Sequence, residues 1–305
     1  VLTSPTETGT VTLALPQDVQ AEAFNFPVNL FNKRVWTIQR IRPDREIIEK
    51  AIELIKNSTK PVIISGGGTI YSGALEELNQ LVDQTGIPVA ETFAGKGAVA
   101  FNKPESIGAV GATGTPGGVE MTKEADLIIG IGTRYSDFTT ASKTAFQNND
   151  VKFININVTE FDSHKNSALP VVSDAKEALK ELILGLAEFR VETSWHQRAI
   201  TYNKSWDEKV TEYYTDKKIL PVSQVEVVGA VNNFADPKDV VVCAAGSLPG
   251  DLHKLWRTQD PKGFHLEYGY STMGYEIAAG VGAKMACPER EIYVMVGDGN
   301  YLMNN

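Results

Sequence analysis

Short apolar runs and longer stretches with helical periodicity alternate along most of the chain. Between residues 43 and 189 the apolar runs include 61–65 and 126–132, and amphipathic stretches lie between them. A short run that is apolar on both faces is typical of a strand inside a parallel sheet, and the amphipathic stretches are typical of the helices that cover it. The alternation predicts an α/β domain in which helices cover both faces of a parallel sheet.

Helix starts in this part of the chain are marked by capping residues. Pro43 and Asp44 precede six apolar residues on one helical face, so a first helix is expected from Asp44 to about Lys56. Further helices are expected at about 74–84 and 175–189. Strands are expected at 61–65, 87–91, 126–132 and 151–157.

The same pattern returns in the last third of the chain. It predicts helices at 224–234, near 252–256 and at 274–286, and strands at 239–246 and 291–299. Before them, residues 190–220 carry tryptophan and tyrosine at roughly helical spacing, which predicts a bridging helix whose aromatic stripe serves packing. The expected fold class is α/β with two doubly wound parallel-sheet domains. These are a central Rossmann-like domain at 41–190 and a second, partial domain at 221–305, with the bridging helix or linker at 191–220.

Both ends of the sequence have the pattern of interrupted domains. Residues 1–40 contain one apolar run, 11–15, which is expected to be a strand, and then an irregular, aromatic-rich stretch. We interpret this part as the end of a preceding domain plus a linker. A strand that ends in Gly-Asp-Gly normally opens a helix, and only the beginning of such a helix follows residue 299. The second unit is therefore expected to be the N-terminal part of a larger domain.

Composition narrows the class of ligand. The 305 residues are 42% hydrophobic and 22% charged, with a formal net charge of -9 and without a dense run of lysine or arginine. These features argue against nucleic acid and anionic membranes as partners and favour a small metabolite. Cys243 and Cys287 lie in apolar stretches, so buried thiols in a reducing compartment are expected. Since no apolar run approaches the roughly 20 residues that span a bilayer, a cytoplasmic protein is expected.

Three glycine-rich strand ends are candidates for phosphate binding. The first, Gly66 to Gly68, lies between a strand and a helix, where backbone N–H groups can hold a phosphate. Its spacing differs from the dinucleotide fingerprint, and no acidic residue ends a following strand where a ribose would need one. A tight turn that lets the helix pack on the sheet is the favoured interpretation.

The second and third strand ends are the runs AAGSLP (244–249) and VGDGN (296–300). In the second, Gly246 removes side-chain bulk and Ser247 adds a hydroxyl, although an ordinary strand-to-helix turn has the same pattern. In the third, Asp298 stands between two glycines. Mg²⁺ prefers oxygen ligands and commonly binds one carboxylate together with phosphate oxygens, so this position suits a divalent cation. Capping of the following helix is the alternative role for Asp298.

The order of these features resembles a known family. The run GSLP after a strand, STMG before a helix and Gly-Asp-Gly after the next strand are similar to the diphosphate-binding domain of the thiamine-diphosphate enzymes related to acetohydroxyacid synthase and pyruvate oxidase. KPVIISGGG, IPVAETFAGKGAV and EADLIIGIGTR resemble the central domain of that family, and GTVTLALPQDV resembles the end of its pyrimidine-binding domain. AAGSLPGDLHKLW, PKGFHLEYGYSTMGYEIAAG and YVMVGDGNYLM are most similar to a branch of the family that hydrolyses a cyclic dione.

The resemblance implies thiamine diphosphate and Mg²⁺ as cofactors and a small-molecule cyclic dione as substrate. A ring carbon–carbon bond would be cleaved to give 5-deoxy-glucuronate in myo-inositol degradation, and the coenzyme would supply the reactive group for this step. Asp298 would bind the metal. The residues that the resemblance places at the coenzyme are Gly246, Ser247, Leu248, Thr272, Met273, Gly297, Asp298, Gly299 and Asn300.

The sequence allows two roles for each of four side chains on these segments. Met273 would be the apolar wedge under the bent coenzyme, or an ordinary packing residue. His253, His265 and Glu267 would touch substrate, or serve ordinary surface or capping roles.

Two parts of the family's site are not expected in this sequence. The second magnesium-ligating asparagine would lie about 25 residues beyond Gly-Asp-Gly, so Asn304 and Asn305 come too early. The activating glutamate belongs to the first domain of a partner subunit, so no catalytic residue is expected here and a homodimer or homotetramer is implied for the full-length enzyme. The isolated polypeptide is expected to be inactive and to bind the coenzyme weakly.

Two other functions stay open at the level of sequence. One is a carboligase or decarboxylase of 2-keto acids similar to acetohydroxyacid synthase. The other is a non-catalytic nucleotide-binding module that uses residues 65–69, which flavin absorbance of the protein would support.

Overall fold

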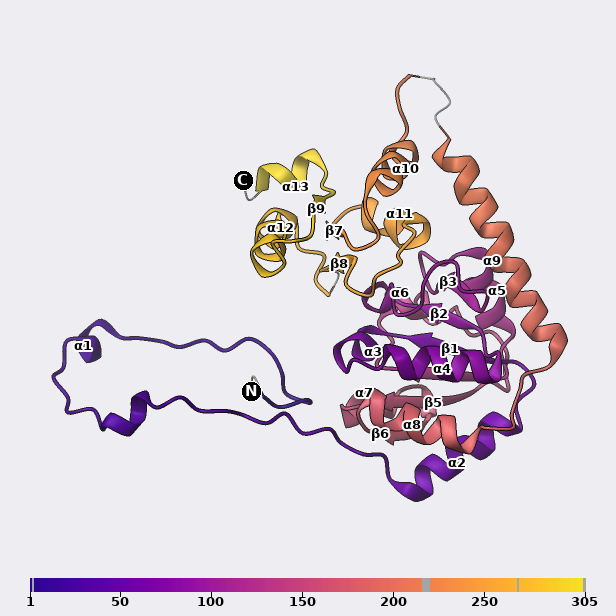
Figure 1. Ribbon diagram of the computed structural model, residues 1–305, viewed down its shortest axis with the longest axis horizontal. Helices are drawn as coiled ribbons and strands as arrows, with labels where there is room; N and C mark the ends of the chain where they lie inside the picture. Colours follow the sequence, from indigo (N-terminus) through magenta and orange to yellow (C-terminus); the bar gives the residue numbers. More distant parts are fainter. Residues whose placement is uncertain (2, 216–219, 268, 304–305) are drawn as a thin grey trace.

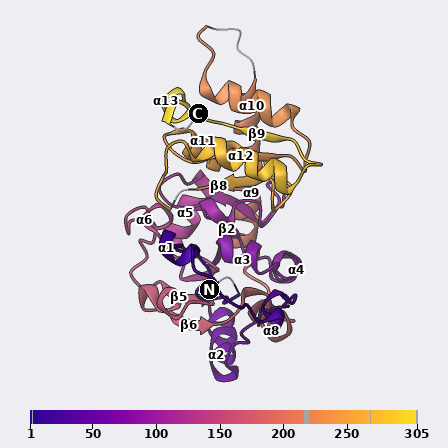
Figure 2. The ribbon, with the colours of Figure 1, turned by 90° about the vertical axis from the view of Figure 1, so that its left-hand side faces the viewer.

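The computed structural model describes residues 1, 3–215, 220–267 and 269–303. Within these residues the chain forms two α/β units that lie one above the other in both views, with a long helix, α9, along one side (Figures 1 and 2). Each unit is built on a parallel sheet, so the expected α/β class is confirmed.

The lower unit contains sheet A, whose six strands have the order β3-β2-β1-β4-β5-β6. This is the order of a Rossmann fold, in which the chain starts in the middle of the sheet and adds strands on either side. The strands are β1 (Pro61–Ser65), β2 (Val89–Glu91), β3 (Ser106–Ala109), β4 (Leu127–Ile131), β5 (Lys152–Asn157) and β6 (Leu169–Val172).

The centre of sheet A forms from strands that are apolar on both faces. Every residue of β1 and β4 is buried, and the two strands pair in parallel from Pro61 with Leu127 to Ser65 with Ile131. Such strands need helices on both sides of the sheet. The expected strands at 61–65, 87–91, 126–132 and 151–157 are confirmed within a few residues, and β3 and β6 are additional.

The helices of this unit follow their capping residues. The carboxylate of Asp44 accepts hydrogen bonds from the backbone N–H groups of Glu46 and Ile47, which starts α2 as expected. The C-cap of α4 is Gly86 with φ 70°, a conformation that favours glycine. The helices are α2 (Arg45–Lys56), α3 (Gly67–Tyr71), α4 (Leu75–Thr85), α5 (Pro116–Glu124), α6 (Asp137–Thr140), α7 (Glu160–Ser163) and α8 (Ala175–Gly185), with 3-10 turns η2 (Phe93–Gly95) and η3 (Lys165–Ser167).

The upper unit contains sheet B, with strand order β8-β7-β9. The fully buried β7 lies in the middle, and its Cys243 is buried, whereas Cys287 is only partly buried, so the expectation of two buried thiols holds for the first. The elements are α10 (Gln224–Phe234), β7 (Val240–Cys243), α11 (Leu248–Leu255), β8 (Phe264–Leu266), α12 (Tyr275–Ala286), β9 (Ile292–Val294) and α13 (Asp298–Met303). The expected helices and strands are confirmed, except that β8 is additional and α11 begins earlier than predicted.

Helix α9 (Thr193–Tyr214) belongs to the hydrophobic cores of both units. Trp195 and Ala199 lie in the core under sheet A, and Val210 and Tyr214 lie in the core of the upper unit. Trp195 also donates its indole N–H to the carbonyl of Pro61 at 3.0 Å. The predicted helix is present up to Tyr214, with Trp195 and Tyr214 packed in the two cores; residues 216–219 of the predicted segment lie outside the described part. None of the helices in the described ranges combines the length and apolarity that a bilayer crossing requires.

Residues 9–40 form an extended arm that leaves the body of the protein (Figure 1). The strand expected at 11–15 is wrong, because these residues pair with no other strand in the described part of the chain and are all exposed. An apolar alternation becomes a strand only where a neighbouring backbone completes its hydrogen bonds. The arm contains only α1 (Gln17–Gln20) and the 3-10 turn η1 (Val28–Phe31).

Candidate functional site

The second and third glycine-rich segments lie side by side at one edge of sheet B. Strands β7 and β9 pair in parallel, Val240 with Ile292 and Val242 with Val294, so both continue into loops at the same edge. The backbone N–H of Met295 still donates to the carbonyl of Val242 at 2.9 Å. Asn300 closes the gap, since its side-chain amide donates to the carbonyl of Ala245 at 3.2 Å. The AAGSLP and VGDGN segments therefore converge at this edge of the sheet.

The third segment, STMG, joins them through a carboxylate that none of the sequence motifs indicates. Glu276, in the first turn of α12, is 1% exposed. It accepts hydrogen bonds from the backbone N–H of Ala245 (3.1 Å) and of Gly274 (3.1 Å) and from the amide of Asn300 (2.9 Å). The signal that could have found it is the single acidic residue in the otherwise apolar, small-residue run GYEIAAGVGA.

The glycines of these loops face open space. Within the described part of the chain, a Cβ built on Gly246 or Gly297 meets no atom within 4 Å, and one on Gly299 meets only the methyl group of Met273, at 4.0 Å. Gly246 has φ 90°, so its backbone conformation favours glycine, but at Gly297 neither φ nor packing within this chain requires it. The absence of a side chain there leaves room beside the backbone N–H groups, which is what a bound phosphate needs.

Asp298 is exposed at the start of α13, beside the open loops. Among the described residues its carboxylate accepts one hydrogen bond, from the N–H of Gly299 at 2.8 Å, and a carboxylate has further acceptor positions that can serve as ligands. Among the described residues no cluster of three or more His, Cys, Asp or Glu is arranged to hold a metal. One carboxylate fits Mg²⁺ only where phosphate oxygens and water complete the octahedron, so the residues present fit a metal that is bound together with a diphosphate.

The other predicted site residues fall into two groups. Ser247 precedes α11 as its N-cap without a side-chain capping bond, and it is exposed next to the partly buried Leu248. Thr272 and Met273 are exposed on the turn before α12, where Met273 is close to Gly299. Asn300, in contrast, is 8% exposed and its amide nitrogen is engaged within the protein.

The first glycine-rich turn, Gly66 to Gly68, is closed by backbone packing. The N–H of Gly66 donates to the carbonyl of Ile131 (2.8 Å), and the N–H of Gly68 donates to the carbonyl of Gly132 (3.0 Å). A Cβ on Gly68 would lie 2.6 Å from the Cα of Gly132, so the two turns need glycine to approach each other. These N–H groups are committed to the fold, which agrees with a tight turn and disfavours a nucleotide phosphate at this place.

His253 lies buried between the two units. Its Nδ1 is 2.9 Å from the hydroxyl of Thr113, its Nε2 is 3.2 Å from the carbonyl oxygen of Glu91, and its ring stacks on Phe93 with centroids 4.1 Å apart. Burial, assisted by the positive charge of Lys96, lowers the pKa of His253 well below the ordinary 6.5. The neutral imidazole therefore packs at the junction between the units, which favours the ordinary structural role.

His265 lies in β8, and Glu267 directly follows the last residue of that strand. His265 Nε2 is 2.6 Å from the hydroxyl oxygen of Tyr275, and burial lowers the pKa of His265. The carboxylate of Glu267 accepts the backbone N–H groups of Tyr270 (2.9 Å) and Thr272 (2.8 Å). Partial burial alone would raise the pKa of Glu267, but these hydrogen bonds outweigh it and lower the pKa. Glu267 thus shapes the turn that carries Thr272 and Met273.

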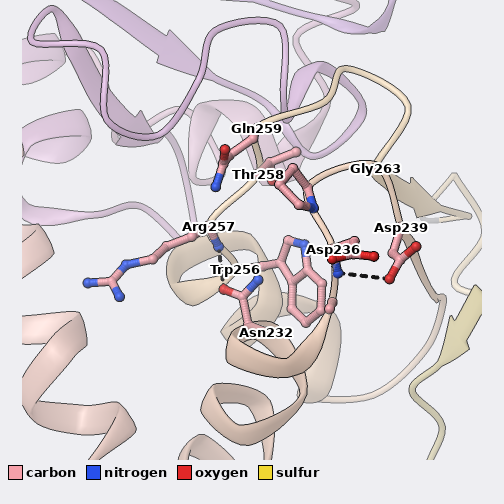
Figure 3. A pocket seen from close by; sticks show the side chains of 10 residues that line it. Asn232, Asp236, Asp239, Trp256, Arg257, Thr258, Gln259 and Gly263 are labelled. Atoms are coloured by element: carbon pink, nitrogen blue, oxygen red, sulfur yellow. Dashed lines mark hydrogen bonds between the residues drawn. The ribbon is translucent and has the colours of Figure 1, made fainter. Parts of the chain in front are cut away.

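A separate shallow pocket lies at the opposite end of sheet B (Figure 3). It is lined by Asp239, which precedes the first residue of β7, and by Asn232, Asp236 and Trp256. Hydrogen bonds from Asp236 N–H to Asp239 (2.8 Å) and from Arg257 N–H to Asn232 (2.8 Å) close its wall. Because the open glycine loops are at the carboxyl ends of the strands, this pocket is not part of the candidate site.

Fold and site together define a class: a Rossmann-like α/β domain joined to a second parallel-sheet unit, whose strand ends present open glycine loops and one acidic residue. Two family models match this chain. The thiamine pyrophosphate enzyme central domain matches residues 48–182, and the C-terminal thiamine-pyrophosphate-binding domain of the same enzymes matches residues 244–305. The chain therefore belongs to the thiamine pyrophosphate enzymes.

Curated relatives share nearly the whole length of the chain. A "3D-(3,5/4)-trihydroxycyclohexane-1,2-dione hydrolase" of Bacillus cereus (strain AH820) is 44% identical over 328 residues, which cover 99% of this chain and 51% of the relative. Proteins with the same name from Bacillus anthracis (strain CDC 684 / NRRL 3495) and Bacillus thuringiensis (strain Al Hakam) are 44% and 43% identical over 327 residues, with the same coverage. The chain spans about half the length of these relatives.

Proposed function

We propose that this chain is part of a thiamine-diphosphate-dependent enzyme that hydrolyses a ring carbon–carbon bond of 3D-(3,5/4)-trihydroxycyclohexane-1,2-dione. The observation that carries the proposal is 44% identity over 99% of the chain to relatives named for that reaction. The product would be 5-deoxy-glucuronate, in myo-inositol degradation. A cytoplasmic homodimer or homotetramer is part of the same proposal, as the family resemblance implies.

The division of the chain follows from this assignment. Residues 41–190 would be the central domain, 191–220 the bridging segment and 221–305 the first part of the coenzyme-binding domain. Residues 1–40 would be the end of the pyrimidine-binding domain plus a linker. The proposal is supported by the two separate hydrophobic cores and by α9, which has residues in each.

The exposed residues at the edge of sheet B would hold the coenzyme. Asp298 would bind Mg²⁺, and Gly297 and Gly299 with Gly246, Ser247 and Leu248 would line the diphosphate, since backbone N–H groups beside glycines and a hydroxyl suit phosphate oxygens. Thr272 and Met273 would contact the pyrimidine side. When bound, the coenzyme supplies an electron sink for cleavage of the carbon–carbon bond.

The chain's own contribution is to bind and orient. The loops hold the diphosphate end and Met273 gives the coenzyme an apolar support, while the buried Glu276 and Asn300 keep the loops together. No group of this chain is assigned to proton transfer.

Measuring which substrate the full-length protein consumes tests the proposal. With thiamine diphosphate and Mg²⁺, the protein is expected to consume the cyclic dione, to release an acid, and to lose activity when either cofactor is removed. Consumption of pyruvate and not of the dione would overturn the proposal in favour of a 2-keto-acid carboligase or decarboxylase. Flavin absorbance in the purified protein would instead favour the nucleotide-binding alternative.

A further inference from the structure

One buried carboxylate contacts all three loops of the candidate site. The donors to Glu276 are the N–H of Ala245 in the AAGSLP segment, the N–H of Gly274 in the STMG turn and the amide of Asn300 in the GDGN turn. Each donor is adjacent in sequence to a residue proposed to contact the coenzyme: Gly246, Met273 and Gly299. One side chain therefore connects all three segments through hydrogen bonds.

The packing of α12 does not require a glutamate at position 276. The helix is otherwise apolar or small in its first turns, and an apolar residue at a 1% exposed position would pack without the need for polar partners. Burial of a carboxylate is unfavourable unless it is fully hydrogen-bonded. Within the described residues Glu276 has no ion pair within 4.0 Å, so its three N–H donors must stay in place together. The requirement couples the positions of the three loops to one another.

We propose that Glu276 is a positioning residue that fixes the spacing of the three coenzyme loops before the coenzyme binds. The inference rests on the proposed function. Glu276 lies beneath the loops and acts through Ala245, Gly274 and Asn300 without touching the ligand. Loops that are already in their binding arrangement lose less conformational freedom on binding, so removal of this carboxylate weakens binding.

The first test is Glu276→Gln in the full-length protein. A carboxylate only accepts hydrogen bonds, whereas a glutamine amide has one acceptor and one donor end. Whichever way the amide is turned, its NH₂ group faces an N–H donor, either that of Gly274 or those of Ala245 and Asn300. We expect the Kd for thiamine diphosphate with Mg²⁺, measured by calorimetry, to rise about tenfold. The KM for the coenzyme should rise similarly, with kcat at saturating coenzyme changed less than about threefold.

Asn300→Ala provides a second variant that removes one donor and leaves the carboxylate in place. It should raise the Kd by a similar factor, and the double variant should raise it by less than the product of the two factors, because both changes break the same contact. The matched control is Glu77→Gln, a buried glutamate on α4 that pairs with Lys176 in the lower unit. The control should leave Kd, KM and kcat unchanged.

The outcomes separate this inference from the proposed function. Wild-type protein without affinity for thiamine diphosphate would overturn both. Wild-type binding together with an unchanged Kd in Glu276→Gln and Asn300→Ala would overturn the positioning role alone. A fall in kcat with an unchanged coenzyme KM would also overturn it, because that pattern indicates loss of folded enzyme and not loosened loops.

Discussion

At the scale of single residues, Asp298 is the side chain on which metal binding should depend. It is exposed, and among the described residues it accepts one hydrogen bond, from the N–H of Gly299. Asp298→Asn keeps the shape and that local acceptor but removes the charge. We expect the full-length protein to bind thiamine diphosphate with Mg²⁺ roughly 10- to 100-fold more weakly, since a contact to a charged group contributes about 1.5–3 kcal/mol. Calorimetry at fixed Mg²⁺ concentration measures the change.

The control for this change is Asp150→Asn, an exposed aspartate in a loop of the lower unit, which should bind as wild type does. Equal affinity in Asp298→Asn and in this control would contradict the assignment of Asp298 to the metal.

His253 should make stability depend on pH. Its pKa is lowered in the folded protein by burial and by Lys96, whereas the unfolded chain takes up a proton near the ordinary 6.5. Below about pH 6.5 the unfolded state therefore binds more protons, and the free energy of unfolding falls by up to about 1.4 kcal/mol per pH unit. His253→Gln should flatten the curve of urea midpoint against pH below about pH 6.5. Above that pH the imidazole is neutral in both states, so its protonation should not affect stability there.

The exposed His164 gives the matched control, because His164→Gln removes a histidine without touching the junction between the units. A pH slope in His253→Gln as steep as in wild type would show that the buried imidazole is not the source of the effect.

The roles of single residues could be predicted from the sequence less well than the fold. The exposed members of the motifs, such as Asp298 and Gly297, follow from local spacing, but Glu276 does not, because its partners Ala245 and Asn300 are 31 and 24 residues away in sequence. A single acidic residue in an apolar helix gives no indication of which distant N–H groups will meet it. Only the register between β7 and β9 brings them together.

At the scale of elements, two glycines test whether a loop is open or closed. Gly68 is packed so closely on Gly132 that Gly68→Ala should destabilise the protein by about 1–3 kcal/mol through overpacking. The methyl group of Gly297→Ala meets no atom of the described residues within 4 Å, so stability should change by less than about 0.5 kcal/mol. Its methyl group would nevertheless occupy the space proposed for the diphosphate, and the Kd for the coenzyme should rise about tenfold. Urea unfolding and calorimetry on both variants give the comparison.

Each glycine is the control for the other. If Gly297→Ala binds the coenzyme as wild type does, the open loop is not the diphosphate site, and if Gly68→Ala is as stable as wild type, the turn at Gly66 to Gly68 does not depend on close packing.

Continuous apolar elements could be predicted, and interrupted or unpaired ones could not. Strands β1 and β4 are continuous buried runs, and α2 has both a capping aspartate and an apolar face, so local sequence is sufficient. Strands β3, β6 and β8 have only three or four residues and contain Gly108, Pro170 or His265, so their strand character comes from pairing with a neighbour. The apolar run at 11–15 fails as a strand for the converse reason, since no neighbour pairs with it in the described part.

At the scale of the whole molecule, α9 connects the two cores. Asn203, near its middle, donates hydrogen bonds to the carbonyls of Phe101 and Ser106 at 2.9 Å, and Trp206 donates to the carbonyl of Lys254 at 3.1 Å. The first two contacts reach the lower unit and the third reaches the upper unit, three residues further along the helix. A continuous helix is therefore needed to keep both sets of contacts.

Ser205→Pro should interrupt this connection. Ser205 is exposed in the middle of α9, where proline removes one backbone hydrogen bond and clashes with the preceding turn, a cost of about 3 kcal/mol or more. Because α9 contributes Trp195 to one core and Tyr214 to the other, amide exchange should become faster in elements of both units, for example in β1 and in α10. Ser205→Ala, which keeps the helix, should leave exchange unchanged. Faster exchange confined to one unit would mean that the cores are held together by the contacts around His253 and not by the helix.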